Sequence, residues 1–298
     1  MNPLRKILAA LRDYRNHPLN RGRRNQAVLE YGFIQLAARM VPGEICVSFP
    51  NDTRLLVPPH MKGAAHYISP RLCEFEPMAF TMHFLRGDDQ FADVGANIGA
   101  FTVLAAGVAG CSVRAFEPSP ASFGTLTRNV RLNDIVQRVK LVNAAAGRTA
   151  GSIPMSTGQG TENHIATAAE SAGTIPVKVT TLDAEFAGED PPVCLKVDVE
   201  GFETEAFAGA ENILAAPKLQ AIIVERNRTR NRYGFDENEL HEKIRQRGFK
   251  PFLYDPFKRE LIPMTEQTTR TLIYLRDLET ACSRLKNARL FHLDDLRA

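Results

Sequence analysis

Residues 91–106 constrain the fold more than any other part of the chain, because they combine a short buried strand, a glycine turn and an apolar helix. Their sequence is F-A-D-V-G-A-N-I-G-A-F-T-V-L-A-A. Gly95 and Gly99 lack a Cβ atom, so the backbone can turn sharply there and approach a ligand closely. The turn leads to a helix N-terminus, where unpaired N–H groups and the helix dipole favour negative charge. The segment therefore predicts a ligand-binding turn in an α/β fold.

An acidic residue at the end of the next predicted strand strengthens this interpretation. Glu117 closes the segment C-S-V-R-A-F-E and lies 22 residues after Gly95. A carboxylate at about this distance binds the ribose in nucleotide-binding βαβ units. The spacing of the turn is G-x-N-x-G and differs from the G-x-G-x-x-G pattern of dinucleotide folds, so a nicotinamide dehydrogenase is the least favoured alternative.

Strand and helix patterns alternate from residue 91 onward, which predicts a mostly parallel sheet covered by helices on both faces. The last two strands are separated by residues without a helical pattern and are expected to pair as a terminal antiparallel hairpin. We thus expect a seven-stranded, Rossmann-like α/β sheet that ends in an antiparallel C-terminal strand. The strands are expected at 91–94, 112–117, 139–143, 193–198, 220–225, 250–254 and 271–276, and the helices at 98–108, 120–133, 203–215 and 236–247.

Three parts are expected along the chain. Residues 1–73 form an N-terminal extension, with helical spacing at 3–16 and 26–40 and a β-hairpin pattern at 43–58. Residues 74–278 form the main domain, and 279–298 a C-terminal tail. Residues 151–175, rich in Gly, Ser, Thr and Ala, are expected to be an irregular loop or lid over the site.

Composition places the chain among ordinary globular proteins, with 44% hydrophobic and 24% charged residues in 298. The net charge of +3 does not by itself indicate nucleic acid. Residues 1–24, however, carry seven basic side chains against one acid, Asp13, so this segment is either a solvated basic helix or a weak contact for an anionic membrane surface.

The five cysteines are scattered, odd in number and without C-x-x-C spacing, which argues against a disulfide framework and fits a reducing compartment. No apolar stretch approaches the length of a transmembrane helix, and the first residues lack the features of a secretory signal. We therefore expect a cytoplasmic location.

Charged residues alternate along a second motif, residues 193–203, whose sequence is V-C-L-K-V-D-V-E-G-F-E. Lys196, Asp198 and Glu200 project to one side because side chains alternate along a strand. Buried charges need partners, so this set forms either a buried ion pair at a capped helix or a functional cluster in a cleft. Asp93 and Asn97 join the same cluster if the first and fourth strands are neighbours, and the clustering favours a functional site.

The two motifs together resemble the FkbM family of methyltransferases. The resemblance rests on D-V-G-A-N-I-G (93–99), F-E-P (116–118), T-L-D (181–183) and L-K-V-D-V-E-G-F-E (195–203), and it extends from about Glu74 to Tyr254. It implies a class I S-adenosylmethionine-dependent fold that binds S-adenosyl-L-methionine. The residues that it implies for cofactor binding are Glu76, Asp93, Gly95, Ala96, Asn97, Gly99, Glu117, Asn143, Ala145 and Asp198.

Among these residues, the resemblance implies that Glu117 accepts hydrogen bonds from the ribose hydroxyls. It also implies that Asn143 and Ala145 lie near the adenine. Phe75 replaces the tyrosine of the family's Y-E-P segment, in which Glu76 is the acid. The catalytic residues are expected to be Asp198 or Glu200 as a general base and Lys196 as the residue that tunes it. The two carboxylates are also potential Mg²⁺ ligands, whereas no compact His-rich cluster supports a transition metal.

The expected function is methyl transfer to a hydroxyl of a saccharide or secondary metabolite, as the resemblance implies. An N-methyltransferase, a nucleic-acid methyltransferase and a non-catalytic cofactor-binding or scaffold protein remain alternatives.

His164 in the expected lid is a candidate catalytic residue or a surface histidine. Glu225, after the fifth strand, is a candidate for the acceptor pocket or for surface pairing. The sequence assigns neither the acceptor nor the oligomeric state.

Overall fold

The computed structural model describes most of the chain. The described residues are 11–12, 14–40, 43–58, 61, 64–68, 72–157, 163–167, 170, 173–225, 233–264, 271–293 and 296–297. Within these ranges, no helix is both long and apolar enough to cross a membrane.

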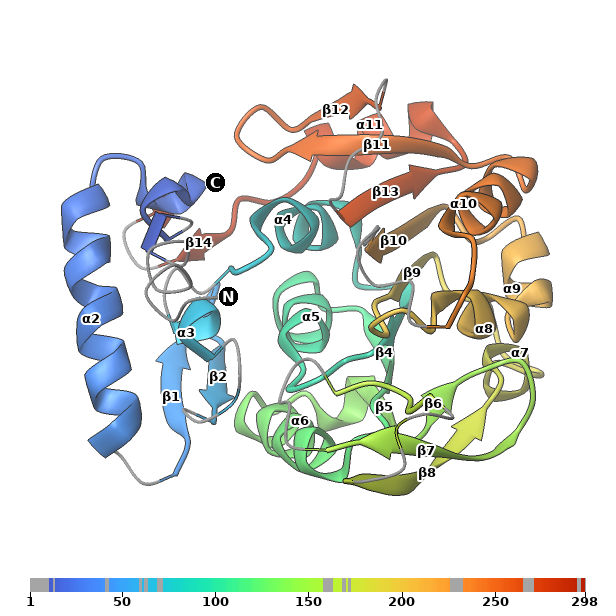
Figure 1. Cartoon of the computed structure of the whole chain (residues 1–298). Helices are drawn as coiled ribbons and strands as arrows, with labels where there is room; N and C mark the ends of the chain where they lie inside the picture. Colours follow the sequence, from blue (N-terminus) through green and yellow to red (C-terminus); the bar gives the residue numbers. More distant parts are fainter. Residues whose placement is uncertain are drawn as a thin grey trace.

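A central eight-stranded sheet organises the molecule (Figure 1), in the order β12-β11-β13-β10-β9-β3-β4-β5. The five strands from β10 to β5 run parallel to one another. β13 is antiparallel to both of its neighbours, β10 and β11, and β12 is antiparallel to β11 at the edge. The bounds are β3 (Gln90–Val94), β4 (Ser112–Phe116), β5 (Val139–Val142), β9 (Cys194–Val197), β10 (Ala221–Glu225), β11 (Lys250–Asp255), β12 (Glu260–Pro263) and β13 (Thr271–Leu275).

The expected Rossmann-like, mostly parallel sheet is confirmed, with two corrections. The sheet has eight strands where seven are expected, because the 256–270 segment contains the short strand β12. The antiparallel C-terminal strand β13 does not end the sheet but lies inside it, between β10 and β11. β13 is buried along most of its length, so its apolar sequence T-L-I-Y-L suits this interior position.

Helices cover both faces because alternate strand residues point to opposite sides. Phe91 packs with one set of helices and Ala92 with the other. The first set is α4 (Phe75–Phe84), α5 (Ala100–Val103), which continues as π-helical turns (Leu104–Ala109), α6 (Pro120–Leu132) and α11 (Leu278–Lys286). The second is α7 (Leu182–Glu185), α8 (Glu203–Ala208), α9 (Glu211–Ala215) and α10 (Glu237–Gln246).

The helix expected at 203–215 is divided into α8 and α9 at Gly209. A Cβ atom on Gly209 would lie 2.1 Å from the backbone oxygen of Gly147, so only glycine allows this close approach. The carboxylate of Asp183 then caps α9 by accepting from the backbone N–H of Asn212 at 3.0 Å. The break therefore allows the chain at Gly209 to pack directly on the backbone of Gly147.

A second, three-stranded sheet lies next to the carboxyl ends of the central strands. It consists of β6 (Ala145–Ala146), β8 (Thr174–Thr180) and β7 (Gly151–Ser156), in that order. The expectation of an irregular segment at 151–175 is therefore wrong for its two ends, which are strands. Residues 158–162, 168–169 and 171–172 in its middle lie outside the described residues.

The N-terminal extension is a long helix, α2 (Arg24–Met40), a hairpin of β1 (Ile45–Ser48) and β2 (Arg54–Val57), and a short helix, α3 (Ala64–Ile68). Asn129 on α6 holds the hairpin: its Oδ1 accepts from the backbone N–H of Leu56 at 2.6 Å, and its Nδ2 donates to the Leu56 carbonyl at 3.1 Å. The expected hairpin and second helix are confirmed. Of the helix expected at 3–16, residues 11–12 and 14–16 are helical, and the rest lies outside the described residues.

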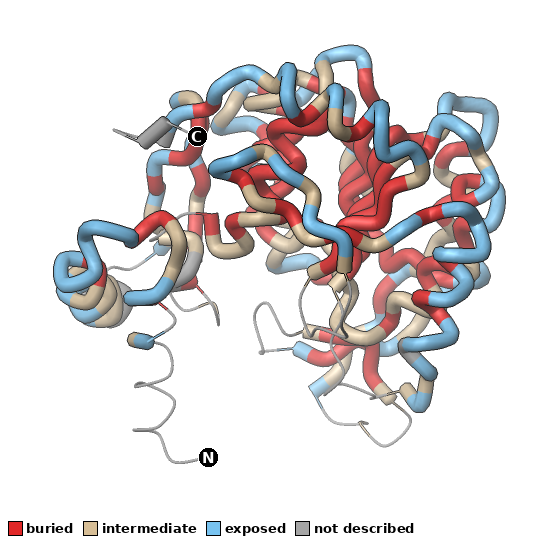
Figure 2. Tube along the Cα trace, turned by 90° about the horizontal axis from the view of Figure 1, so that it is seen from above, coloured by how far each residue is buried: buried red, intermediate tan, exposed pale blue. Residues whose placement is uncertain are grey.

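The C-terminal segment follows the last sheet strand with α11, which packs against α4. Arg284 on α11 forms an ion pair with the buried Asp89 at 2.5 Å. A final two-stranded pairing joins β14 (His292–Leu293) to β15 (Leu296–Arg297). Figure 2 shows the buried strands at the centre of the molecule and α2 at its periphery. The predicted domain boundaries at 73/74 and 278/279 stay predictions.

Candidate functional site

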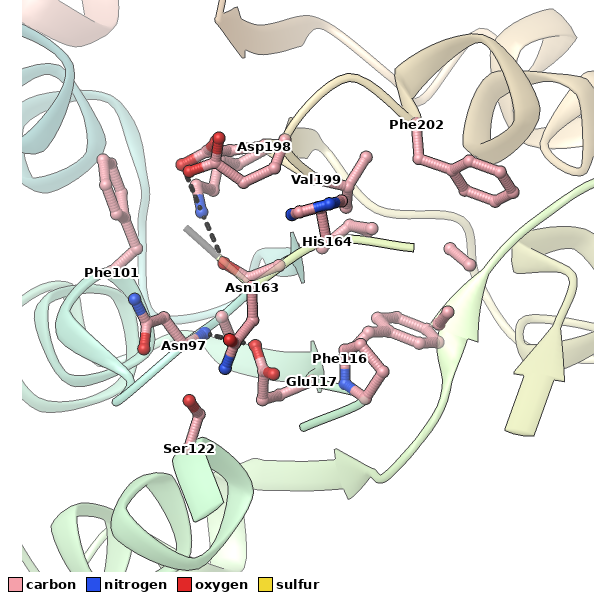
Figure 3. Close-up of a pocket in the computed structure, with 18 of the residues that line it drawn as sticks. Asn97, Phe101, Phe116, Glu117, Ser122, Asn163, His164, Asp198, Val199 and Phe202 are labelled. Atoms are coloured by element: carbon pink, nitrogen blue, oxygen red, sulfur yellow. Dashed lines mark hydrogen bonds and ion pairs between the residues drawn. The ribbon is translucent and has the colours of Figure 1, made fainter. Parts of the chain in front are cut away.

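A cavity of about 280 Å³ lies at the carboxyl ends of β3, β4, β9 and β10. The second sheet closes one side of it through Ala145 and Met155, and Phe101 of α5 lines another side (Figure 3). Its volume is near the lower end of the range for small-molecule sites, roughly 300–1,000 Å³. Ligands bind at this edge of open α/β sheets, where the strand order reverses between β3 and its neighbours.

The turn after β3 forms the floor of the cavity. The backbone N–H groups of Gly95 and Ala96 both donate to the carbonyl of Phe116, at 3.0 and 2.9 Å. Gly95 has a φ of 77°, and a Cβ atom there would lie 1.9 Å from the backbone oxygen of Asp198. Asn97 has a φ of 52°, a left-handed conformation that asparagine tolerates better than most residues. The turn thus needs both its glycine and its asparagine to pass beneath the cavity.

Glu117 is fixed beside this turn. Its Oε2 accepts from the backbone N–H of Asn97 at 2.9 Å, and its Oε1 accepts from that of Ser119 at 2.8 Å. Burial raises the pKa of Glu117 to about 7, although these two hydrogen bonds lower it. Each carboxylate oxygen keeps a further lone pair, so Glu117 can accept two hydrogen bonds from a ligand.

Lys196 connects the two motifs below the cavity. Its Nζ donates to the carbonyl of Gly95 at 2.9 Å and lies 3.4 Å from Asp93 Oδ1 and 3.5 Å from Asp198 Oδ2. Burial lowers the pKa of Lys196, but the carboxylates of Asp93, Asp198 and Glu74 outweigh it and raise that pKa above its ordinary value. Lys196 is therefore a permanent cation that ties the turn after β3 to the end of β9.

Carboxyl groups line the remaining side of the cavity. Burial and the charge of Asp198 raise the pKa of Glu74 to about 7, against the lowering effect of Lys196. Burial and the charges of Asp198 and Glu74 raise the pKa of Glu225 to about 8. Glu200 follows β9 in a left-handed conformation with a φ of 56°. With Glu117, five carboxyl residues among the described part of the chain line the cavity, together with Lys196.

The segment at 163–165 closes part of the cavity. His164 is buried, and its Nδ1 lies 3.1 Å from Ser156 Oγ while its Nε2 lies 3.1 Å from Glu170. Ile165 accepts at its carbonyl from the Tyr233 hydroxyl at 2.6 Å. Because both ring nitrogens of His164 have protein partners, we interpret it as the residue that positions this segment over the cavity.

The structure brings eight predicted site residues together in the cavity lining and leaves four outside it. The eight are Gly95, Ala96, Asn97, Glu117, Ala145, Lys196, Asp198 and Glu200. The four are Glu76, Asp93, Gly99 and Asn143. Their predicted roles in binding and catalysis remain predictions.

Each of the four has an identifiable place. Asp93 is buried directly behind Lys196 and accepts from Thr102 Oγ1 at 2.7 Å. Gly99 is the N-cap residue of α5, where a Cβ atom would meet Leu126 Cδ1 at 2.5 Å. Asn143 Nδ2 donates to the backbone carbonyl of Glu117 at 2.8 Å, so it supports that strand end.

Glu76 lies in the first turn of α4, and its neighbour Glu74 lines the cavity in its place. Sequence reasoning missed Glu74, Tyr67 and Ser122, all of which line the cavity. Glu74 is the N-cap residue of α4, and an acid directly before an apolar helix was the available signal.

Among the described residues, no group of three or more His, Cys, Asp or Glu is arranged to hold a metal ion.

Comparison with known proteins identifies the family of the chain. The Methyltransferase FkbM domain model matches residues 93–251, more than half of the chain. The chain therefore belongs to the FkbM family of methyltransferases, and the family predicted from its two motifs is confirmed.

Two curated relatives have the same general description. "Methyltransferase 1" of Beauveria bassiana (strain ARSEF 2860) is 32% identical over 151 residues, which are 42% of this chain and 60% of the relative. "Methyltransferase sdnD" of Sordaria araneosa is 36% identical over 64 residues, 21% of this chain and 25% of the relative. The chain thus spans less than two thirds of the length of either relative. The crystal structure of an FkbM methyltransferase from Methylobacillus flagellatus KT superposes with a TM-score of 0.46 and 16% identity, over 88% of this chain and 62% of that one.

Proposed function

We propose that the chain is an S-adenosylmethionine-dependent methyltransferase that methylates a hydroxyl group of a saccharide or secondary metabolite. The observation that carries the proposal is the carboxylate of Glu117, held by two backbone N–H groups beside the glycine turn. A ribose diol donates two hydrogen bonds, and this carboxylate has two acceptor positions left for them.

The donors and acceptors of the cavity fit this cofactor. The Oδ1 atom of Asn97 is buried and accepts no hydrogen bond from the described residues, so a ligand donor would satisfy it. The absence of a side chain at Gly95 lets the backbone of Asp198 pack directly against the turn, which brings the ends of β3 and β9 together at the cavity. Ala144, Ala145 and Phe116 line the cavity and offer apolar surface for a planar base.

When bound, S-adenosylmethionine supplies an electrophilic methyl group on its sulfonium sulfur. The chain's own residues must then align the acceptor and remove its proton. Asp198 lines the cavity 3.5 Å from the Lys196 ammonium, so its carboxylate is the first candidate to accept this proton. Glu200, which also lines the cavity, is the second candidate for this role.

The carboxyl groups of the cavity also support the acceptor class. Glu74, Asp198, Glu200 and Glu225 can each accept a hydrogen bond from a hydroxyl, which suits an acceptor with several hydroxyls. Those carboxyl groups of the set that are ionised would attract a protonated amine. This cluster makes N-methylation the second candidate function.

A transfer assay tests the proposal and separates the two candidates. The full chain is incubated with methyl-labelled S-adenosylmethionine and matched acceptor panels, one of saccharides and other alcohols and one of amines of similar size. Labelled ethers that are identified by mass spectrometry support the proposal. Label found exclusively on nitrogen contradicts the hydroxyl assignment, and cofactor binding without transfer to either panel favours a non-catalytic protein.

A further inference from the structure

The helix α2 has two apolar faces, one packed on the protein and one open. Ala27 is fully buried, and Tyr31 packs on the ring of Tyr14 with ring centroids 5.1 Å apart. The open face carries the exposed residues Leu29, Phe33, Leu36 and Met40, which we call the outer stripe.

The spacing of the outer stripe shows that its four side chains share one face. Successive members are four, three and four residues apart, the pattern that aligns side chains along a helix. Leu29 and Phe33 follow Ala27 and Tyr31 by two residues, about 200° around the helix. The exposed fractions of the four side chains lie between 54% and 75%. A surface this apolar on a single helix indicates a binding face.

Positive charge surrounds the start of this helix. Five arginines there are exposed, and the one acid among the described residues of 11–40 is Glu30, which pairs with Arg23 at 2.5 Å. A second cavity of about 330 Å³ is lined by Arg12, Arg15 and Arg24, with Leu11, Asn16 and Val28. None of these lining residues is acidic. The exposed arginines are Arg12, Arg15, Arg21, Arg23 and Arg24.

We propose that α2 and the arginines at its start dock the protein on an anionic lipid surface. The outer stripe enters the boundary between headgroups and acyl chains, and Arg12, Arg15 and Arg24 bind lipid phosphates. Helices with Phe and Leu on one face and basic residues beside it bind membranes in this orientation. Each arginine near an anionic surface adds electrostatic attraction that salt screens.

A second copy of the chain fits this surface less well. Parallel pairing of two α2 helices would bring both arginine groups together, which is unfavourable. Antiparallel pairing avoids the repulsion, but four stripe side chains are few beside the roughly 20–30 residues a side of a stable interface. The charge of the surface therefore favours lipid.

Vesicle cosedimentation of the full chain tests the proposal. The vesicles are phosphatidylcholine alone and phosphatidylcholine with phosphatidylserine. The variants are Leu29→Glu with Phe33→Glu, the triple change of Arg12, Arg15 and Arg24 to Gln, and Ile262→Glu. Ile262 is an exposed apolar residue on the edge strand β12, so its variant controls for an added surface acid. Circular dichroism confirms that each variant is folded.

We expect the wild type and Ile262→Glu to bind the phosphatidylserine vesicles and to dissociate as salt is added. The stripe variant and the arginine variant are each expected to bind the phosphatidylserine vesicles at least about tenfold more weakly than the wild type. Absence of binding by the wild type overturns the proposal, as does equal binding by the stripe variant. A wild-type dimer that the stripe variant converts to a monomer, measured by analytical ultracentrifugation without lipid, would overturn it in favour of an interface between copies.

Discussion

The Nζ atom of Lys196 lies 3.4 Å from the Oδ1 atom of Asp93, and both side chains are buried beneath the cavity. Asp93 ends β3 and Lys196 lies on the neighbouring strand β9, so the pair joins the two sequence motifs. Removal of the Lys196 ammonium would leave the carboxylates of Asp93 and Asp198 without their shared cation.

We predict that Lys196→Met lowers the free energy of unfolding by about 3–5 kcal/mol, the cost of leaving a buried charge unpaired. Urea unfolding measures the change. Lys140→Met is the control, because Lys140 pairs with Glu189 at 3.6 Å on the surface and its loss should cost less than about 1 kcal/mol. Equal costs for the two variants would show that the buried pair does not contribute as argued.

The glycine of the β3 turn gives a second prediction. Gly95→Ala is expected to lower the free energy of unfolding by about 2–4 kcal/mol, because its Cβ atom would collide with the Asp198 carbonyl and the φ is positive. Thermal and urea unfolding measure it. Gly151→Ala, where a Cβ atom meets open space, should change stability by no more than about 0.5 kcal/mol. A Gly95→Ala protein as stable as Gly151→Ala would contradict the close approach.

The catalytic assignment gives a third prediction. Asp198→Asn is expected to reduce turnover by about 100- to 10,000-fold, the usual contribution of a well-placed base. Glu200→Gln is measured beside it, and Glu205→Gln serves as a control because Glu205 pairs with Arg148 outside the cavity. Near-normal turnover of both Asp198→Asn and Glu200→Gln would remove these residues from the role of base.

Much of the site could be predicted because its residues lie next to recognisable backbone signals. The glycines of the β3 turn and the alternating charges of β9 follow directly from turn and strand geometry. Strand β8 is not predicted, although Ile175, Val177 and Val179 alternate with other residues, because the sequence before it is rich in Gly, Ser, Thr and Ala, a composition typical of loops. Its partner β7 contains Pro154, which disfavours a strand in sequence reasoning.

The choice between Glu74 and Glu76 as the acid that lines the cavity depends on where α4 begins. Glu74 and Glu76 are two residues apart, and at about 100° per residue they face opposite sides of a helix start. No capping signal in the sequence around them predicts the first residue of the helix. The helix α4 begins at Phe75, so Glu74 is its N-cap residue. The place of β13 inside the sheet likewise depends on how β11 and β13 return across it, which no local pattern specifies.

The raised pKa of Glu225 gives a prediction of pH dependence. Its pKa in the folded protein, about 8, exceeds the ordinary value of 4.5, so the folded state holds the proton more tightly than the unfolded chain. The stabilisation by this proton is complete below about pH 4.5 and is lost as the pH rises through 8.

Glu225→Gln removes the buried charge that forms at high pH. The melting temperature of this variant should exceed that of the wild type at pH 9 by several degrees, and the difference should shrink at pH 6. Differential scanning calorimetry at the two pH values measures this. A difference that does not depend on pH would contradict the raised pKa.

The central claim is that Glu117 holds the cofactor. Isothermal titration calorimetry with S-adenosylhomocysteine on the wild type and on Glu117→Ala tests it most directly, with Glu242→Ala as a surface control and NAD as a control ligand. We predict micromolar binding to the wild type and to Glu242→Ala, about 100-fold weaker binding or none to Glu117→Ala, and no binding of NAD. Equal affinity of the wild type and Glu117→Ala would contradict the account, as would the absence of binding to the wild type.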